Sequence, residues 1–156
     1  MSELMKSARL HRIGEKLNID DVEIPEAGAD AVVVEVRASG ICHSDINYRD
    51  GIGSVGKLPI TLGHEIAGLI AKTGSRVEGI HEKDRVCVHY VIGCGTCVFC
   101  RTNRENYCEK YQMIGKDVDG GFAQYARVPA RNVLELPDVI PFEQGAYHAL
   151  RRARAL

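Results

Sequence analysis

Short apolar stretches separated by glycine-rich turns dominate the chain. Residues 31–38 read AVVVEVRA, a β-branched run that predicts a strand buried on at least one face. Residues 7–12 and 17–24 predict two further strands, and the Gly14-Glu15-Lys16 segment between them indicates a hairpin. The first quarter of the chain is therefore expected to be β-structure.

The middle of the chain continues this pattern. In the strand predicted at 84–90, Val86 and Val88 alternate on one face, and Cys87 and His89 lie on the opposite face. Further strands are predicted from Leu62-Gly63-His64-Glu65 to about Thr73, at 122–128 after the Gly120-Gly121 turn, and at 132–136. Six or more short strands with little helix predict a mainly β, barrel-like fold.

Two segments have helical character. Residues 44–49 are expected to form a short helix with Ser44 or Asp45 near its N-terminal cap. A second helix is expected over 141–156, because it begins with a proline, which the first helical turn tolerates. Its end carries Arg151, Arg152 and Arg154, and cations at a helix C-terminus interact favourably with the helix dipole without any ligand.

Length and charge narrow the range of functions. A chain of 156 residues is expected to form one domain, residues 1–156, and is long enough to bury its own core. Its net charge of −1 implies neither nucleic acid nor an anionic membrane as a partner. No apolar run approaches the roughly 18 residues that a membrane span needs, and no secretory signal is visible at the start. These features predict a cytoplasmic protein.

Four of the six cysteines form a tight cluster. Cys94, Cys97, Cys100 and Cys108 follow a C-x2-C-x2-C-x7-C spacing within the segment 93–111. Four thiolates can surround a zinc ion in a tetrahedron at about 2.3 Å each. The spacing therefore predicts a structural zinc site in an irregular lobe that projects from the β-domain.

Two other types of site, an iron–sulfur cluster and a pair of disulfides, fit the four cysteines less well. A bacterial ferredoxin-type iron–sulfur site needs a short last gap and a proline after the fourth cysteine, whereas here the last gap is seven residues and Glu109 follows. Two disulfides would need an oxidising compartment, of which the chain gives no sign. Zinc fits the spacing best.

The segment Gly51-Ile52-Gly53-Ser54-Val55-Gly56 matches the G-x-G-x-x-G dinucleotide fingerprint letter for letter. That fingerprint requires a strand before it and a helix after it. Here a helix-like polar segment precedes it, and Lys57-Leu58-Pro59 follows, where the proline disfavours helix. We interpret the segment as a loop.

The sequence also offers two candidate ligands for a second metal site. Cys42 and His64 each follow a turn or a strand end, and a catalytic zinc takes three protein ligands that can include both residue types. Asp45 and Glu65 are the carboxylates placed to orient such ligands. The alternative is a buried, apolar Cys42 and a hydrogen-bonded loop His64, because ligands 22 positions apart are weak evidence.

Three motifs occur together and in order: GICHSD at 40–45, GHEIAG at 63–68, and CGTCVFC at 94–100 with Cys108 after it. In this combination the chain resembles the zinc-dependent medium-chain alcohol dehydrogenases over nearly its whole length. The resemblance implies the N-terminal catalytic domain of that family. Its fold is GroES-like, a partly open β-barrel with a few short helices and a projecting zinc-binding lobe.

The resemblance assigns ligands to both metal sites. Cys42 and His64 match the catalytic zinc ligands, and Glu65 matches a residue that can enter the coordination sphere. Cys87 matches no ligand position and is expected in the core. The structural zinc ligands are matched by Cys94, Cys97, Cys100 and Cys108.

The resemblance also implies a reaction, the NAD- or NADP-linked oxidation of an alcohol to an aldehyde or ketone. Zinc acts there as a Lewis acid, and the nicotinamide carries the redox step. Ser44 matches the hydroxyl that passes on the substrate proton, and His43 matches a position near the cofactor that continues the relay. Asp45 matches the carboxylate that supports the histidine ligand.

Two departures from the family pattern affect this expectation. The family supplies a third catalytic ligand shortly after the segment matching 141–146, but here Ala146 runs directly into Tyr147, as if a short segment were deleted. No strand, glycine-rich turn and helix that would begin a Rossmann domain follow in the sequence. We therefore expect a truncated catalytic domain that is inactive alone, binds no NAD or NADP by itself and self-associates.

Two alternative functions stay open at this stage. One is an enzyme that another chain completes with a nucleotide-binding domain. The other is a non-enzymatic zinc-binding or assembly module that uses the GroES-like fold.

Overall fold

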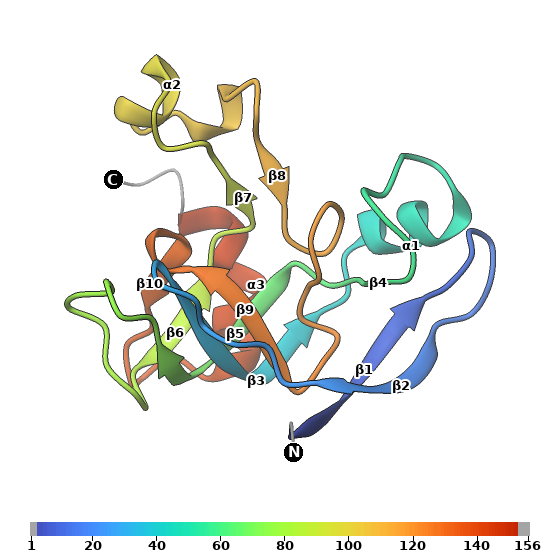
Figure 1. Cartoon of the computed structure of the whole chain (residues 1–156), viewed down its shortest axis with the longest axis horizontal. Helices are drawn as coiled ribbons and strands as arrows, with labels where there is room; N and C mark the ends of the chain where they lie inside the picture. The colour runs from blue at the N-terminus through green and yellow to red at the C-terminus, as the bar shows by residue number, and fades with distance from the viewer. Residues whose placement is uncertain (1–2, 153–156) are drawn as a thin grey trace.

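A computed structural model describes residues 3–152 of the chain (Figure 1). Its elements, in chain order, are β1 (Leu4–Leu10), β2 (Asn18–Glu23), β3 (Ala31–Gly40), α1 (His43–Asp50), β4 (Ile60–Thr61), β5 (Glu65–Thr73), β6 (Arg85–Val88), β7 (Val91–Ile92), α2 (Val98–Arg101), η1 (Glu105–Tyr107), β8 (Gln112–Met113), β9 (Tyr125–Pro129), η2 (Ala130–Asn132), β10 (Val133–Glu135) and α3 (Phe142–Arg152). The fold is mainly β and forms no closed barrel, as predicted for a GroES-like domain.

A five-stranded antiparallel sheet forms the centre of the molecule, in the order β10-β6-β5-β3-β9. The predicted strand 31–38 is its longest member, β3, which pairs with both β5 and β9. One face of this sheet carries the main core, which includes Val32, Val34, Ile66, Ile70, Val86, Val88 and Val128. Burial of these β-branched side chains holds the sheet that supports the candidate site.

The predicted hairpin is confirmed and forms a second sheet. β1 pairs antiparallel with β2 over Leu4–Arg9 and Asn18–Glu23, and β4 adds to the other edge of β1. Leu10, Ile60 and Leu62 are buried together beneath it. β7 and β8 form a separate two-stranded ribbon that leads to the projecting segment at the top of Figure 1.

α3 covers the opposite face of the central sheet and contacts β3, β5 and β6. Ala146 is buried there with Ala67, Cys87 and Leu136. The alternation predicted for 84–90 is confirmed for residues 86–88, since Val86 and Val88 enter one core and Cys87 the other; β6 ends at Val88, so His89 lies outside the strand. The helix expected over 141–156 is described from Phe142 to Arg152, and residues 153–156, including Arg154, lie outside the described part.

Several predicted boundaries were wrong. The strand expected from Leu62 begins at Glu65, so His64 lies in the turn before it, and the strand expected at 122–128 begins only at Tyr125. The first helix begins at His43 instead of Ser44; its N-cap residue is Cys42, and Asp45 lies near the cap as predicted, at the third helical position. Among the described residues, no helix is long and apolar enough to cross a membrane.

Candidate metal centres

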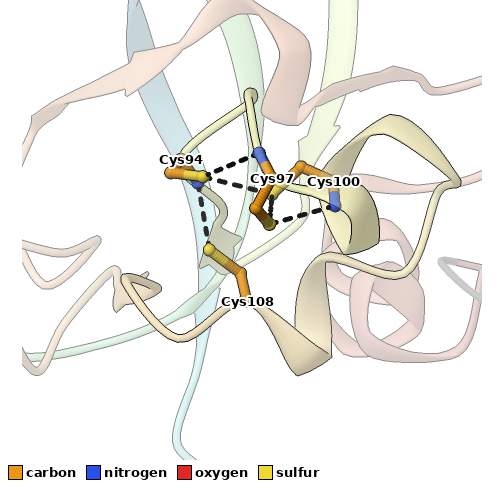
Figure 2. A group of neighbouring side chains, drawn as sticks. All are labelled: Cys94, Cys97, Cys100 and Cys108. Atoms are coloured by element: carbon orange, nitrogen blue, oxygen red, sulfur yellow. Dashed lines mark hydrogen bonds between the residues drawn. The ribbon is translucent and has the colours of Figure 1, made fainter.

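The projecting lobe brings the four clustered cysteines together (Figure 2). Cys94 follows β7, Cys97 caps α2, Cys100 lies within α2, and Cys108 follows η1. Short helical turns and Gly95, at φ 78°, reverse the chain often enough to point the four sulfurs at one place. Among the described residues, none of the three buried apolar clusters is formed by residues of this lobe, which is typical of a segment organised by a metal ion.

The sulfur positions fit a tetrahedral zinc ion. The Sγ atoms of Cys97 and Cys100 lie 3.5 Å apart, and those of Cys94 and Cys100 lie 3.9 Å apart. Four sulfurs at 2.3 Å from one zinc ion would be separated by about 3.8 Å. Backbone N–H groups donate to three of the sulfurs: Cys94 N to Cys108 at 3.3 Å, Cys97 N to Cys94 at 3.4 Å, and Cys100 N to Cys97 at 3.4 Å.

Hydrogen bonds and burial shift the pKa values of two lobe cysteines, Cys94 and Cys100, in opposite directions. Donation from Thr96 lowers the pKa of Cys94 to about 5, with the backbone N–H of Cys97 adding to the effect. Burial raises the pKa of Cys100 to about 12. The lobe thus holds one thiolate readily at neutral pH, and a metal cation would have to displace the proton of Cys100.

Two residues of η2 connect the lobe to the central sheet. The buried side-chain amide of Asn132 donates to the carbonyls of His89 at 2.8 Å and Val91 at 2.7 Å, which fixes the chain entering β7. The Arg131 guanidinium donates to the carbonyl of Gly93. The lobe is therefore fixed at its base by side chains from a distant part of the sequence.

A second cluster forms beside α1, where β3 ends and β5 begins. The donor atoms of Cys42, His64 and Glu65 all lie within 4.8 Å of one another. Cys42 follows β3 and caps α1, whereas His64 lies in the turn before β5. His64 and Glu65 are buried and Cys42 is half-buried, so the cluster has one side open to ligands from solvent.

Asp45 holds the two ligand-bearing turns together. Its carboxylate accepts the backbone N–H of Cys42 at 2.9 Å and that of Gly63 at 3.2 Å. The same carboxylate lies 3.3 Å from His64 Nδ1 and is only 3% exposed. The carboxylate oxygen and Nδ1 are close but not aligned for a hydrogen bond. The negative charge beside Nδ1 still favours a proton there, which leaves the Nε2 lone pair free for a metal ion.

Ser44 and Tyr90 complete the surroundings of His64. Ser44 Oγ lies 3.4 Å from His64 Nε2, on the side where a metal ligand would bind. The Tyr90 ring packs against the His64 ring with centroids 5.4 Å apart. A hydroxyl therefore lies next to the open side of the cluster, and an aromatic ring restricts the histidine.

Burial and neighbouring charges shift the pKa values of the cluster. Burial alone would raise the pKa of Cys42, but hydrogen bonding with Ser44 and the proximity of His64 give a net lowering. Burial raises the pKa of Glu65, and the charge of Asp45 adds to that increase. A thiol that ionises easily beside an imidazole is a donor pair suited to zinc.

Comparison with known proteins identifies the family. Residues 28–138 match the alcohol dehydrogenase GroES-like domain family. The chain belongs to this family. The NAD-dependent alcohol dehydrogenase of Sulfolobus acidocaldarius is 37% identical over 131 residues, covering 80% of this chain and 38% of the relative. The L-threonine 3-dehydrogenase of Pyrococcus horikoshii is 36% identical, covering 92% of this chain and 42% of the relative.

Solved structures agree with this family assignment. A cobalt- and zinc-bound thermostable alcohol dehydrogenase from Pyrobaculum aerophilum superposes with a TM-score of 0.86 at 30% identity, covering 92% of this chain and 44% of that one. A dehydrogenase from Escherichia coli complexed with NADH gives a TM-score of 0.85 at 35% identity, covering 94% and 42% of the two chains. The chain thus spans about two fifths of the length of these relatives.

Three other features singled out in the sequence of this GroES-like domain, His43, Cys87 and the glycine motif, lie outside both cysteine clusters. His43 is exposed at the first turn of α1, beside Ser44. Cys87 is 2% exposed and packs in the core beneath α3. The glycine motif at 51–56 forms an irregular loop after α1, as interpreted from the sequence.

Sequence reasoning missed the residues that support the two clusters. Tyr90, Arg131 and Asn132 carry no ligand atom for either site, so no ligand motif marks them. Arg131 and Asn132 stand at the start of the strand predicted over 132–136, a position with no specific meaning without the fold. The third catalytic ligand expected from the family is also not found, because no further His, Cys, Asp or Glu among the described residues joins the Cys42 group.

Proposed function

We propose that this chain is the catalytic domain of a zinc-dependent alcohol dehydrogenase, which oxidises alcohols to aldehydes or ketones with NAD or NADP. The observation that carries the proposal is the convergence of Cys42, His64 and Glu65 from two separate turns. The relatives include NAD-dependent alcohol dehydrogenases, which supports the reaction type. The substrate is proposed only as a small alcohol or the corresponding carbonyl compound.

The donor sets of both clusters fit zinc. Four thiols in the lobe give the all-sulfur set of a structural site, whereas thiol, imidazole and carboxylate give the mixed set of a catalytic site. We propose Cys94, Cys97, Cys100 and Cys108 as structural ligands. We propose Cys42, His64 and Glu65 as catalytic ligands, with Glu65 in place of the family's missing third ligand.

A zinc ion at the second site would supply Lewis acidity, which lowers the pKa of a bound alcohol. The chain's own residues would then handle the released proton. Ser44 Oγ, 3.4 Å from His64 Nε2, is placed to accept it, and the exposed His43 next to it can pass it to solvent. Asp45 is a positioning residue that keeps His64 oriented, and His43 would also lie near the nicotinamide cofactor.

The 156-residue polypeptide by itself is proposed to be inactive. Hydride transfer requires the nicotinamide to be held against the substrate carbon. Among residues 3–152, the strands pair antiparallel and the glycine motif at 51–56 precedes no helix, so this part offers no dinucleotide-binding unit. A metal site whose third ligand is a neighbouring glutamate is further expected to hold zinc weakly.

Self-association and a cytoplasmic location are also proposed. Three isoleucines in or beside α1 are exposed, Ile41 at 77%, Ile46 at 38% and Ile52 at 68%, which favours self-association. All six cysteines are free thiols, which suits the reducing cytoplasm. The net charge of −1 favours neither nucleic acid nor membrane surfaces.

Zinc titration of matched variants tests the proposal. The wild-type chain should bind two zinc equivalents, and Cys42→Ser should lose only the weaker one. Cys87→Ser is the control, because Cys87 is buried in the core away from both clusters and should leave two equivalents bound. Loss of zinc binding in Cys87→Ser, or an unchanged second equivalent in Cys42→Ser, would refute the assignment.

A further inference from the structure

Gly40 occupies a special place beside the second cluster. It is the last residue of β3 and pairs directly with Glu65, the first residue of β5. Cys42 lies two residues after Gly40, and His64 directly precedes Glu65. The three candidate ligands therefore lie in or next to the Gly40–Glu65 pair, the last residue pair between β3 and β5.

The space above Gly40 is filled by the Glu65 side chain. A Cβ atom on Gly40 would lie 2.0 Å from Glu65 Oε2, 3.1 Å from its Cδ and 3.0 Å from its Cβ. Side chains directly opposite in an antiparallel pair normally stand side by side. Here the glutamate instead lies back across the glycine, and this orientation brings its carboxylate toward Cys42 and His64.

The backbone conformation at position 40 does not require a glycine. Gly40 is not among the residues with positive φ, so an alanine could adopt its backbone conformation. The atoms nearest to an added Cβ all belong to Glu65. Gly68 in the same ladder differs, because a Cβ there would meet the backbone oxygen of Glu35 at 2.0 Å. Gly68 thus allows the backbone of Glu35 to approach closely, whereas Gly40 leaves space for the Glu65 carboxylate.

We propose that Gly40 is a positioning residue whose missing side chain creates the space that places the Glu65 carboxylate at the metal site. The inference rests on the proposed catalytic zinc site. An alanine at position 40 would force the carboxylate oxygen to move by about 1–1.5 Å to reach ordinary van der Waals separation. Zinc–ligand distances tolerate changes of only about 0.2 Å, so Glu65 could not remain a ligand in its present position.

A double-mutant cycle tests the proposal. The wild-type chain, Gly40→Ala, Glu65→Ala and Gly40→Ala/Glu65→Ala are first loaded with one zinc equivalent in the lobe. The dissociation constant of the second equivalent is then measured by competition with a chromophoric chelator, and the melting temperature is recorded in parallel. Gly40→Ala should weaken the second zinc by about 10- to 100-fold, the range seen when groups around a metal site are lost.

The double variant provides the decisive comparison. It should bind the second zinc no more weakly than Glu65→Ala alone, because the crowding partner has been removed. An unchanged affinity in Gly40→Ala, or an equal further loss in the Glu65→Ala background, would overturn the proposal.

The melting temperatures separate this inference from the proposed function. If the wild-type chain bound only one zinc ion, the catalytic site would be refuted, but Gly40→Ala should still lower the melting temperature in the wild-type background and not in the Glu65→Ala background. Equal decreases in both backgrounds would show that Gly40 acts on something other than Glu65.

Discussion

Replacing Asp45 by alanine should both destabilise the fold and weaken the second metal site. Asp45 is 3% exposed and accepts two backbone N–H groups, from Cys42 at 2.9 Å and from Gly63 at 3.2 Å. These bonds connect the start of α1 to the turn that carries His64. No other described acceptor is hydrogen-bonded to either N–H group, so the substitution leaves two donors unpaired.

The magnitude follows from those two donors. A buried polar group left without a partner costs about 1–3 kcal/mol. The buried Gly63 N–H carries this cost in full and the part-buried Cys42 N–H adds less, so Asp45→Ala should lower the free energy of unfolding by about 1–3 kcal/mol or somewhat more. For a chain of this length, each 1 kcal/mol corresponds to about 2–4 °C in melting temperature. Asp45→Asn retains one acceptor oxygen and should lose about half as much.

Urea unfolding at a fixed zinc concentration measures this change, with Asp50→Ala as the matched control. Asp50 lies in the same helix, but its ion pair with Arg49 is at the surface, where solvent screens the interaction, so its loss should change stability little. A loss below 1 kcal/mol for Asp45→Ala, or a loss equal to that of Asp50→Ala, would refute the role given to this carboxylate.

Three further predictions concern the lobe and the surface. Cys97→Ser should lose the tightly held zinc and lower the melting temperature, since all four lobe ligands lie within 15 residues and their site contributes folding energy directly; a full zinc equivalent with unchanged melting would contradict this. Zinc affinity of the lobe should rise with pH, because at pH 7 binding must displace the proton of Cys100, whose pKa is raised to about 12; calorimetry showing the same affinity at pH 6 and pH 8 would count against it. Light scattering should show self-association at high concentration, and Ile41→Ser should reduce it; a strict monomer would disprove the surface argument.

The sequence predicted those elements whose signal is local. The β-branched run 31–38 and the hairpin over residues 7–24 were correct because strand periodicity and turn residues act over a few positions. The two-residue strands β4, β7 and β8 were missed because such short strands show no periodicity. Asp45 lies near the cap of α1 as predicted and accepts the Cys42 N–H, but Cys42 itself was not recognised as the cap residue because cysteine is unusual at that position.

The candidate sites likewise contain residues with a local sequence signal and residues whose role appears only in the fold. The spacing of Cys94, Cys97 and Cys100 alone predicts a metal-binding lobe. In contrast, Cys42 and His64 were paired only through resemblance to a family, because they are 22 positions apart. The roles of Gly40, Tyr90 and Asn132 depend on long-range packing. No sequence rule states which glycine will lie beneath a carboxylate, so these roles required the fold.

The central claim is that one chain carries a strong four-cysteine zinc site and a weak site built on Cys42, His64 and Glu65. The most direct test counts zinc after brief exposure of the 156-residue polypeptide to a mild chelator and assays it with NAD or NADP on several alcohols. The account predicts one retained zinc equivalent, lost in Cys97→Ser, and no turnover. Two chelator-resistant zinc equivalents together with measurable alcohol oxidation would contradict it.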